Sequence, residues 1–269
     1  MCIRDRFKVV VASAALASGR FTADSLLPGP KTYQLPNSSK KLRNWTGREC
    51  GPEGKVTLRQ ALAISCNTAF AWLGNELGAA AIRDQAEAFG FNSGFNIPLR
   101  AATSLFPQDP DAPQTALSAI GQFEVRATAL QMAMVAASIG NSGRTMNPYL
   151  VQEIRGPDLS ILQTTEPSQF EDALKPSNSL SLTEMLVNVV ENGTGSNAQI
   201  AGVRVAGKTG TAQTGNDSPS VAWFISFAPA AAPKVAVAVV IEESGFAEVS
   251  GNGLAAPIAK EVMEAVLGS

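Results

Sequence analysis

The 269-residue chain contains no histidine. This absence excludes every Ser-His-Asp or Cys-His catalytic arrangement and every zinc site that depends on imidazole ligands. Any acid–base chemistry in this protein must therefore use lysine, aspartate, glutamate, tyrosine or cysteine side chains.

Charged residues are also scarce. They make up 16% of the chain, against roughly 25% in soluble domains, and the formal net charge is -2. Such a chain offers no basic field for a nucleic-acid backbone, so nucleic acid is not expected as a partner. The longest apolar runs, such as residues 235–241, are far shorter than the ~20 residues that span a bilayer. No intact signal peptide is visible.

The three cysteines, Cys2, Cys50 and Cys66, are too few and too widely spaced for a CxxC metal or redox motif. They allow one disulfide with one thiol left over. We predict no metal site and no cofactor from these residues or from any other pattern in the chain.

The first two thirds of the chain are typical of helices separated by polar loops. Apolar spacing, capping residues and glycine stops predict the helices, and clusters of proline, serine and asparagine predict the loops. Prolines are expected to prevent regular structure just before Thr115. The longest loop spans residues 25–54 and is expected to contain short strands. The predicted helices cover residues 7–17, 58–64, 67–78, 79–89, 127–141 and 181–191.

The last third of the chain changes character. Residues 203–205 alternate apolar and polar side chains, residues 221–228 are aromatic and β-branched, and residues 234–242 are rich in valine. These three segments are expected to be strands. A link of hairpin length joins the second and third strands, which predicts that they pair antiparallel.

Pro257 is suited to the first turn of a final helix that places Ile258, Val262 and Val266 on one face. The order is helices first, then strands, then a closing helix. This order predicts the α+β class, with an antiparallel sheet and helices packed on it.

Residues 202–209 match the phosphate-binding pattern GxxxxGK[ST]. A phosphate cradle needs backbone N–H groups that converge from a curled loop and a helix that starts at the lysine. Two of the four loop positions hold valine, which prefers an extended chain, and the residues after Thr209 do not favour a helix. The preferred interpretation places Lys208, Thr209 and Gly210 on a strand.

That strand completes an ordered set of short motifs. The Ser65-Cys66-Asn67 run is weak evidence alone, because SxN occurs by chance about once in a chain of this length. The context is specific: Phe7-Lys8-Val9-Val10, residues 62–70, Gly121-Gln122, residues 208–212 and residues 254–258. With these motifs the chain resembles the penicillin-binding transpeptidases, especially the class B enzymes of actinobacteria, from residue 7 to residue 269.

The resemblance implies a fold similar to that of the serine β-lactamases and three motifs, SxxK, SxN and KTG. Lys8 occupies the lysine place of SxxK, where the amine takes a proton from the nucleophilic serine. Ser65 is expected to relay protons to the leaving amine, and Asn67 to hydrogen-bond the substrate amide. Lys208 is expected to add positive potential that favours a deprotonated Lys8.

The KTG strand is expected to bind the substrate. The resemblance implies that Thr209 binds a terminal carboxylate, that Gly210 leaves room for it, and that the Thr211 N–H forms half of an oxyanion hole. A donor peptide would lie antiparallel along this strand. The implied reaction is acyl transfer from a D-alanyl-D-alanine stem peptide and cross-linking of peptidoglycan.

The implied setting is the extracytoplasmic face of the cell membrane, with the anchor outside this chain. The resemblance implies β-lactam antibiotics as further ligands and proteins of cell-wall synthesis or division as partners. Because disulfides persist outside the cytoplasm, Cys50 and Cys66 are predicted to pair. They would close a loop of about sixteen residues, worth roughly 3 kcal/mol in the chain-entropy model.

The chain departs from the family pattern at Asp5, which stands where SxxK has its serine. Without this nucleophile the chain as written is expected to be inactive. Residues 1–6 are interpreted as a non-native junction and residues 7–269 as a transpeptidase domain incomplete at its N-terminus. The family carries the first strands of the sheet upstream of SxxK, so the 234–242 strand is expected to show an open edge.

Two alternative functions stay open. A β-lactamase or D,D-carboxypeptidase of the same fold passes the acyl group to water, although no glutamate in an omega-loop context supports a lactamase. A non-catalytic penicillin-binding-like interaction module would keep Asp5 as a native residue. The motif residues also have plain structural interpretations: solvated charges for Lys8 and Lys208, and a helix cap for Ser65 and Asn67.

Overall fold

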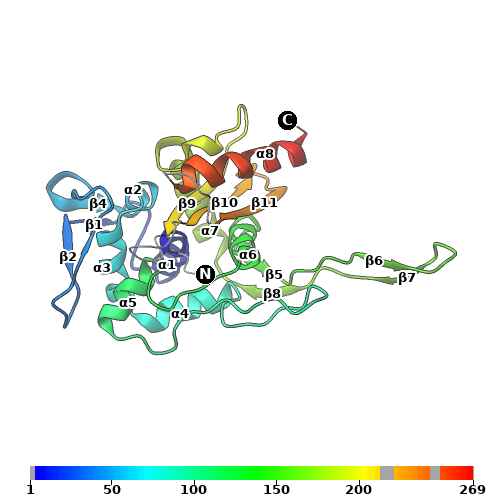
Figure 1. Ribbon diagram of the computed structural model, residues 1–269, viewed down its shortest axis with the longest axis horizontal. Coiled ribbons are helices and arrows are strands. Elements are labelled where there is room, and N and C mark those ends of the chain that lie inside the picture. The colour runs from blue at the N-terminus through cyan, green and yellow to red at the C-terminus, as the bar shows by residue number, and fades with distance from the viewer. Residues whose placement is uncertain (1–3, 213–220, 243–248, 269) are drawn as a thin grey trace.

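A three-stranded antiparallel sheet lies at the centre of the molecule, between helices on its two faces (Figure 1). The computed structural model describes residues 4–212, 221–242 and 249–268. The strand order is β11-β10-β9, and this architecture agrees with the predicted α+β class. The strands are β9 (Ala206–Ala212), β10 (Val221–Ala228) and β11 (Val235–Ile241).

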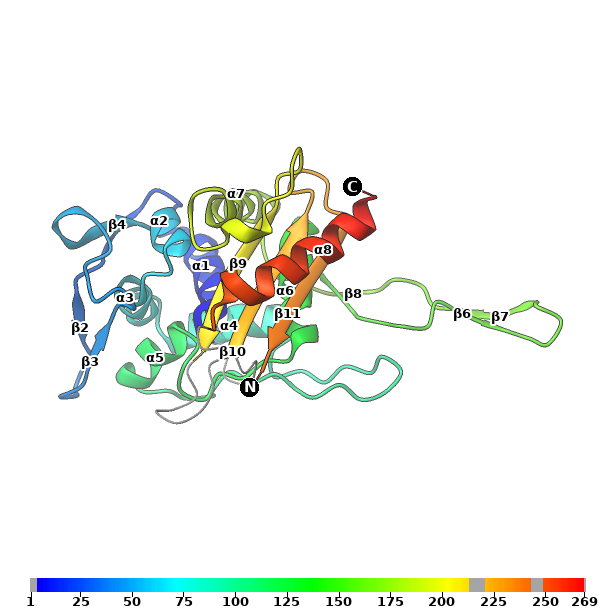
Figure 2. The same cartoon turned by 45° about the horizontal axis from the view of Figure 1, so that its top comes forward.

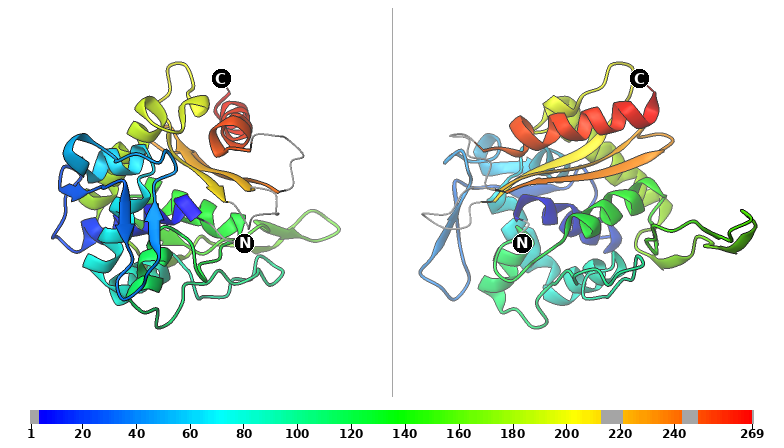
Figure 3. Two further views of the ribbon diagram at one scale, coloured as in Figure 1. Left: turned by 60° about the vertical axis from the view of Figure 1, so that its left-hand side comes forward. Right: turned by 45° about the vertical axis from the view of Figure 1, so that its right-hand side comes forward.

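The helices form two layers around this sheet. Helix α8 covers one face, and helices α1, α6 and α7 lie against the other (Figures 2 and 3). A second lobe holds four further helices. The layers comprise α1 (Phe7–Ala17), α6 (Ala129–Gly140), α7 (Pro176–Asn192) and α8 (Ala256–Leu267), and the lobe α2 (Leu58–Ala63), α3 (Asn67–Leu77), α4 (Ala79–Ala88) and α5 (Ala112–Ala119).

Strand β10 is buried on both faces, and its side chains alternate between two cores. Trp223, Ile225 and Phe227 belong to the larger core on the α1 side of the sheet. Ala222 and Phe224 belong to the smaller core beneath α8. Burial on both faces explains why this strand is a continuous apolar run in the sequence.

Helix α1 is buried along almost its whole length. Residues 7–16 are all buried, and the polar side chains among them are Lys8 and Ser13. An apolar surface on every side is typical of a core helix. The helix follows a 3-10 turn (Arg4–Arg6) directly, so Lys8 enters the core in the first helical turn.

Pairs of short antiparallel strands, here called ribbons, lie outside the three-stranded sheet. The predicted short strands within residues 25–54 are confirmed by the first two ribbons. One further ribbon is a hairpin arm, β6–β7, that projects away from the body (Figure 1). The pairs are β1 (Leu26–Pro28) with β4 (Lys55–Thr57), β2 (Thr32–Gln34) with β3 (Lys41–Arg43), β5 (Arg144–Met146) with β8 (Gln169–Asp172), and β6 (Glu153–Arg155) with β7 (Ile161–Thr164).

Several predicted boundaries are wrong. The strand expected at 203–205 starts at Ala206, because the chain turns at Gly202 (φ +75°) and Val203 bridges back to Ile200. Helix α7 starts at Pro176 and not at residue 181. Helix α5 starts at residue 112, since a proline in the first turn gives up no helical hydrogen bond.

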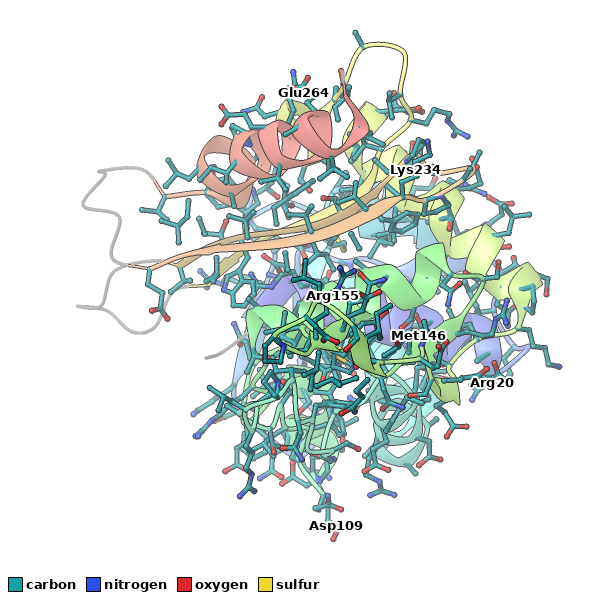
Figure 4. The ribbon with its side chains drawn as sticks, turned by 90° about the vertical axis from the view of Figure 1, so that its right-hand side faces the viewer. Arg20, Asp109, Met146, Arg155, Lys234 and Glu264 are labelled. Carbon is teal, nitrogen blue, oxygen red and sulfur yellow. A yellow bond between two sulfur atoms is a disulfide. The ribbon has the colours of Figure 1, made fainter. Side chains whose placement is uncertain are left out.

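Strand β11 is an edge of the sheet in the described part of the chain. Figure 4 shows this edge from the side, with α8 above it and α6 below. Helix α8 turns Ala259 and Met263 towards the sheet, whereas Ile258 and Val262 on the face predicted from the sequence are 43% and 42% exposed. An unpaired strand next to apolar side chains is a template for pairing with another chain.

We expect the chain to self-associate through β11, and Val240→Lys to weaken this association. A lysine at an edge strand opposes pairing, and its aliphatic stem can stay on the half-buried surface while the amine reaches water. Sedimentation velocity at several concentrations should show fewer dimers and larger species for V240K than for the unmodified chain. Ile161→Lys on the hairpin arm is the matched control, because Ile161 is 57% exposed away from β11. Equal association of V240K and the unmodified chain would contradict this expectation.

Candidate active site

Four polar side chains from three distant segments meet at one point. Lys8 Nζ donates to Ser65 Oγ at 3.0 Å and to Asn67 Oδ1 at 2.7 Å. Lys208 Nζ donates to the same Ser65 Oγ at 3.1 Å. The four residues predicted from SxxK, SxN and KTG therefore lie together, with the Ser65 hydroxyl bonded to both amines.

Lys8, Ser65 and Lys208 are held in position by three different kinds of local structure: a helix, a turn and a strand. Lys8 lies in the first turn of α1, and Lys208 lies in the middle of β9. Ser65 lies on the turn between α2 and α3 with a φ of +57°, in the left-handed region. This conformation reverses the chain within two residues after α2, where the Cys66 N–H donates to the Ala61 carbonyl at 2.8 Å. The reversal brings the serine hydroxyl to the start of α1.

The plain structural interpretations of these residues are wrong. Lys8 and Lys208 are both fully buried and cannot be solvated charges. The residue that caps α3 is Cys66, with no side-chain cap bond. Asn67 instead accepts from Lys8 through Oδ1 and donates through Nδ2 to the Arg43 carbonyl at 3.1 Å. The Asn67 amide has a second N–H, for which no bond to another described residue is seen.

Asp5 points into this cluster. Its Oδ1 lies 2.6 Å from Lys8 Nζ, and its side chain is 19% exposed. Asp5 lies on the 3-10 turn before α1, three residues before Lys8, at the position that the sequence analysis compares with the serine of SxxK. In this pair the Lys8 amine donates a hydrogen bond to the Asp5 carboxylate.

The electrostatics of the site centre on Lys208. Burial lowers the pKa of Lys208 from 10.5 to about 7, the Asp5 carboxylate opposes this shift, and the cations of Lys8 and Arg6 add to it. Near neutral pH the Lys208 amine is therefore divided between its charged and neutral forms. The positive potential that the sequence analysis expects from Lys208 stays a prediction, and it depends on pH.

The position of Lys208 on a strand also rules out the interpretation of residues 202–209 as a phosphate-binding loop. Lys208 pairs with Ile225 of β10 in the register of the sheet, and the chain stays extended to Ala212. A phosphate cradle requires a helix to begin at the lysine. The residues after Thr209, which do not favour a helix, were the signal that predicted this outcome.

The side chains of the KTG strand have partners that the sequence did not predict. The Thr209 hydroxyl lies 2.7 Å from the Thr194 hydroxyl. The Thr211 hydroxyl accepts from the Gly251 N–H at 3.3 Å. Thr194 follows the glycine break after α7, and that Asn-Gly-Thr-Gly turn was the signal available in the sequence.

Arg6 is a second residue that the sequence analysis did not single out. Its guanidinium lies 3.9 Å from the centre of the buried Trp223 ring, and the side chain is fully buried. A Cβ atom at Gly210 would come within 3.0 Å of Arg6 Nη1. The room beside Gly210 therefore holds the Arg6 guanidinium in this chain.

A disulfide fixes the turn that carries Ser65 and Asn67. Cys50 and Cys66 are bonded as predicted, with Cα atoms 6.0 Å apart and a sequence separation of 16. The bond ties the loop after β3 to the middle residue of the SxN run. The third cysteine, Cys2, lies outside the described residues.

Comparisons with known proteins agree with this geometry. The family model described as "Penicillin binding protein transpeptidase domain" matches residues 6–264. The chain belongs to this family. Among the relatives, "Peptidoglycan D,D-transpeptidase PbpA" of Mycobacterium tuberculosis is 44% identical over 266 residues, which cover 97% of this chain and 54% of that protein.

The structural matches point the same way. The penicillin G acyl-enzyme complex of penicillin-binding protein A from M. tuberculosis superposes with a TM-score of 0.92 at 43% identity, covering 99% of this chain and 61% of that one. The D,D-transpeptidase domain of a peptidoglycan glycosyltransferase from Eggerthella lenta gives a TM-score of 0.89 at 33% identity, covering 100% and 65%.

These matches confirm the predicted relationship to class B penicillin-binding transpeptidases and the predicted fold. The chain spans about half the length of the mycobacterial relatives. No helix among the described residues is long and apolar enough to cross a membrane.

Removing the disulfide of this transpeptidase domain should destabilise it. Replacing Cys50 and Cys66 together with serine is expected to lower the free energy of unfolding by about 3 kcal/mol, because the unfolded chain gains the freedom of the opened loop. Urea unfolding measures the change. Cys2→Ser is the control for loss of a cysteine as such. A double variant as stable as the unmodified chain would show that the bond contributes no stability.

The lowered pKa of Lys208 predicts how stability depends on pH. Between pH 7 and about 10.5 the unfolded chain keeps a proton on this lysine that the folded chain has lost, so the free energy of unfolding rises with pH in that window. Lys208→Met should flatten this rise, measured by urea unfolding at several pH values. Lys234→Met, at an exposed lysine before β11, should keep it. A rise that persists unchanged in K208M would refute the assignment.

Proposed function

We propose that this chain is the acyl-transfer domain of a peptidoglycan D,D-transpeptidase, and that Asp5 blocks its acylation step. The observation that carries the proposal is the Ser65 hydroxyl, which is hydrogen-bonded to both buried lysine amines. The match to the transpeptidase family over residues 6–264 supports it. The names of the mycobacterial relatives support the substrate class.

The proposed reaction needs a serine hydroxyl at position 5. The Lys8 amine takes the proton of that hydroxyl while its oxygen attacks the carbonyl carbon between the two D-alanines. The carbon–nitrogen bond breaks, and the proton passes through Ser65 to the amine of the leaving D-alanine. An acceptor amine then attacks the ester, forms the cross-link and restores the hydroxyl.

The substrate is proposed to lie along β9. This strand is the other edge of the sheet in the described residues, so its outer hydrogen-bonding groups can pair with an extended peptide. Thr209 is proposed to bind the terminal carboxylate, Gly210 to leave room for it, and the Thr211 N–H to stabilise the oxyanion. In this chain Arg6 fills the space beside Gly210.

The same proposal covers the ligands and the setting. The penicillin G acyl-enzyme of the related M. tuberculosis protein supports β-lactams as ligands of this fold. The relatives' part in peptidoglycan synthesis supports a place on the extracytoplasmic face of the membrane, with proteins of cell-wall synthesis or division as partners. Residues 1–6 as a non-native junction, and a domain over residues 7–269, stay predictions.

A specific observation favours a second candidate for the chain as written. The Asp5–Lys8 ion pair at 2.6 Å satisfies the buried amine without a nucleophile. A chain with this pair keeps the shape of the site and loses the chemistry. The second candidate is therefore a non-catalytic module that binds peptidoglycan peptides.

Asp5→Ser should convert the chain into one that penicillin acylates. The substitution removes the carboxylate from Lys8 and supplies the missing hydroxyl. Loss of a nucleophilic serine costs on the order of a million-fold in rate in subtilisin, so the contrast with the unmodified chain should be all or none. Mass spectrometry after incubation with penicillin G measures the covalent adduct.

Two variants separate the roles of charge and nucleophile. Asp5→Asn removes the carboxylate without supplying a hydroxyl and should stay unlabelled. D5S combined with Lys8→Met should also stay unlabelled, because the general base is gone. Two results would refute the proposed function. One is a penicillin adduct on the unmodified chain that persists in D5N, and the other is a folded D5S variant that gains no adduct.

A further inference from the structure

Two large exposed side chains stand beside the candidate active site. Arg43 is exposed at the end of β3, and Trp45, two residues later, is 88% exposed. Within the described residues neither side chain has a hydrogen bond, an ion pair or a ring contact. Tryptophan and arginine are the side chains that most often dominate the energetics of binding surfaces.

The segment that carries them is held firmly in place. Asn44 between them is buried, and its Nδ2 donates to the Pro30 carbonyl at 3.0 Å and to the Arg48 carbonyl at 2.8 Å. The Asn44 Oδ1 accepts from the Thr68 N–H on α3 at 3.0 Å. The exposed-buried-exposed pattern is typical of an extended segment, in which Arg43 and Trp45 project on the side opposite Asn44.

This segment also contacts the group of side chains formed by Lys8, Ser65, Asn67 and Lys208. The Arg43 carbonyl accepts from Asn67 Nδ2 at 3.1 Å, and Asn67 Oδ1 accepts from Lys8 Nζ at 2.7 Å. Two hydrogen bonds therefore connect the Arg43 backbone to the amine of the SxxK lysine. The Cys50–Cys66 disulfide closes the same loop onto the Ser65 turn.

We propose that Arg43 and Trp45 form a recognition platform for the carboxylate-bearing upstream part of the stem peptide. The inference rests on the proposed function. A peptide on β9 with a carbonyl bound by Asn67 continues upstream towards the Arg43 segment, at about 3.3 Å per extended residue. The guanidinium pairs with a carboxylate through two parallel hydrogen bonds, and the indole ring offers a flat apolar face to the aliphatic chain beside it.

The test is equilibrium binding to the chain as written, in which Asp5 prevents acylation. The probes are two peptides, acetyl-γ-D-glutamyl-L-lysyl-D-alanyl-D-alanine with the glutamyl α-carboxyl group either free or amidated. Titration calorimetry should show the free carboxylate bound about fivefold more tightly, the upper range for a solvent-exposed ion pair. Arg43→Ala should abolish this preference.

Two further variants separate the platform from a general loss of charge. Arg48→Ala removes the same charge from an exposed position in the same loop and should keep the preference. Trp45→Ala should weaken both peptides to a similar extent, and Trp45→Phe should restore most of the affinity. The thermal melting of each variant checks that the loop still folds.

The remaining outcomes count against the platform and not against the proposed function. Binding of both peptides without a preference, or the same loss in R43A and R48A, overturns the platform and leaves the proposed function intact. Failure of the unmodified chain to bind either peptide overturns the platform, whereas the proposed function is tested separately by the penicillin adduct of D5S.

Discussion

The burial of two lysine amines against one serine hydroxyl is the constraint on which the rest of the structure depends. A buried amine without hydrogen-bond acceptors costs several kcal/mol. The acceptors here are Ser65 Oγ, the Ser65 carbonyl, Asn67 Oδ1 and the Thr209 carbonyl. Because these acceptors come from one turn and one strand, folding must bring α1, the SxN turn and β9 together.

The scaffold around this point is built to hold it. Helix α1 lies in the larger core, so Lys8 cannot swing out to water without disturbing the packing of its neighbours. Strand β10 pairs with β9 along its whole length and is itself buried on both faces. The disulfide and Asn44 then fix the SxN turn from the opposite side. Rigid support of this kind is what an acyl-transfer site requires, because small displacements of the reacting groups lower the rate.

Asp5 and Arg6 show how two residues can change such a site without changing its architecture. Asp5 pairs with Lys8, and Arg6 stacks on Trp223 in the space beside Gly210. Both side chains enter from the turn before α1. Beside them the two amines, the Ser65 hydroxyl and the Asn67 amide contact one another.

Much of this arrangement could be predicted from the sequence, and the failures have physical causes. The helix over residues 7–17 was predicted from its alanine-rich sequence and the glycine at position 19, whereas its burial in the core is seen only in the structure. The strand at 203–205 was misplaced because the alternation of Val203 and Val205 was interpreted as extended chain, whereas residues 200–203 form a local turn at Gly202 in which Val203 bridges to Ile200. Arg6 and Thr194 were missed because their roles depend on contacts between distant segments. The pKa of Lys208 was also beyond the sequence, since burial causes it.

The central claim is that Lys208 is a buried amine poised beside Ser65, and the most direct test is to titrate that amine itself. Nuclear magnetic resonance of the chain with labelled lysine side chains follows each amine as a function of pH. We predict one lysine signal that titrates near pH 7 and disappears in K208M. A spectrum in which every lysine titrates near its ordinary pKa of about 10.4 would contradict the account.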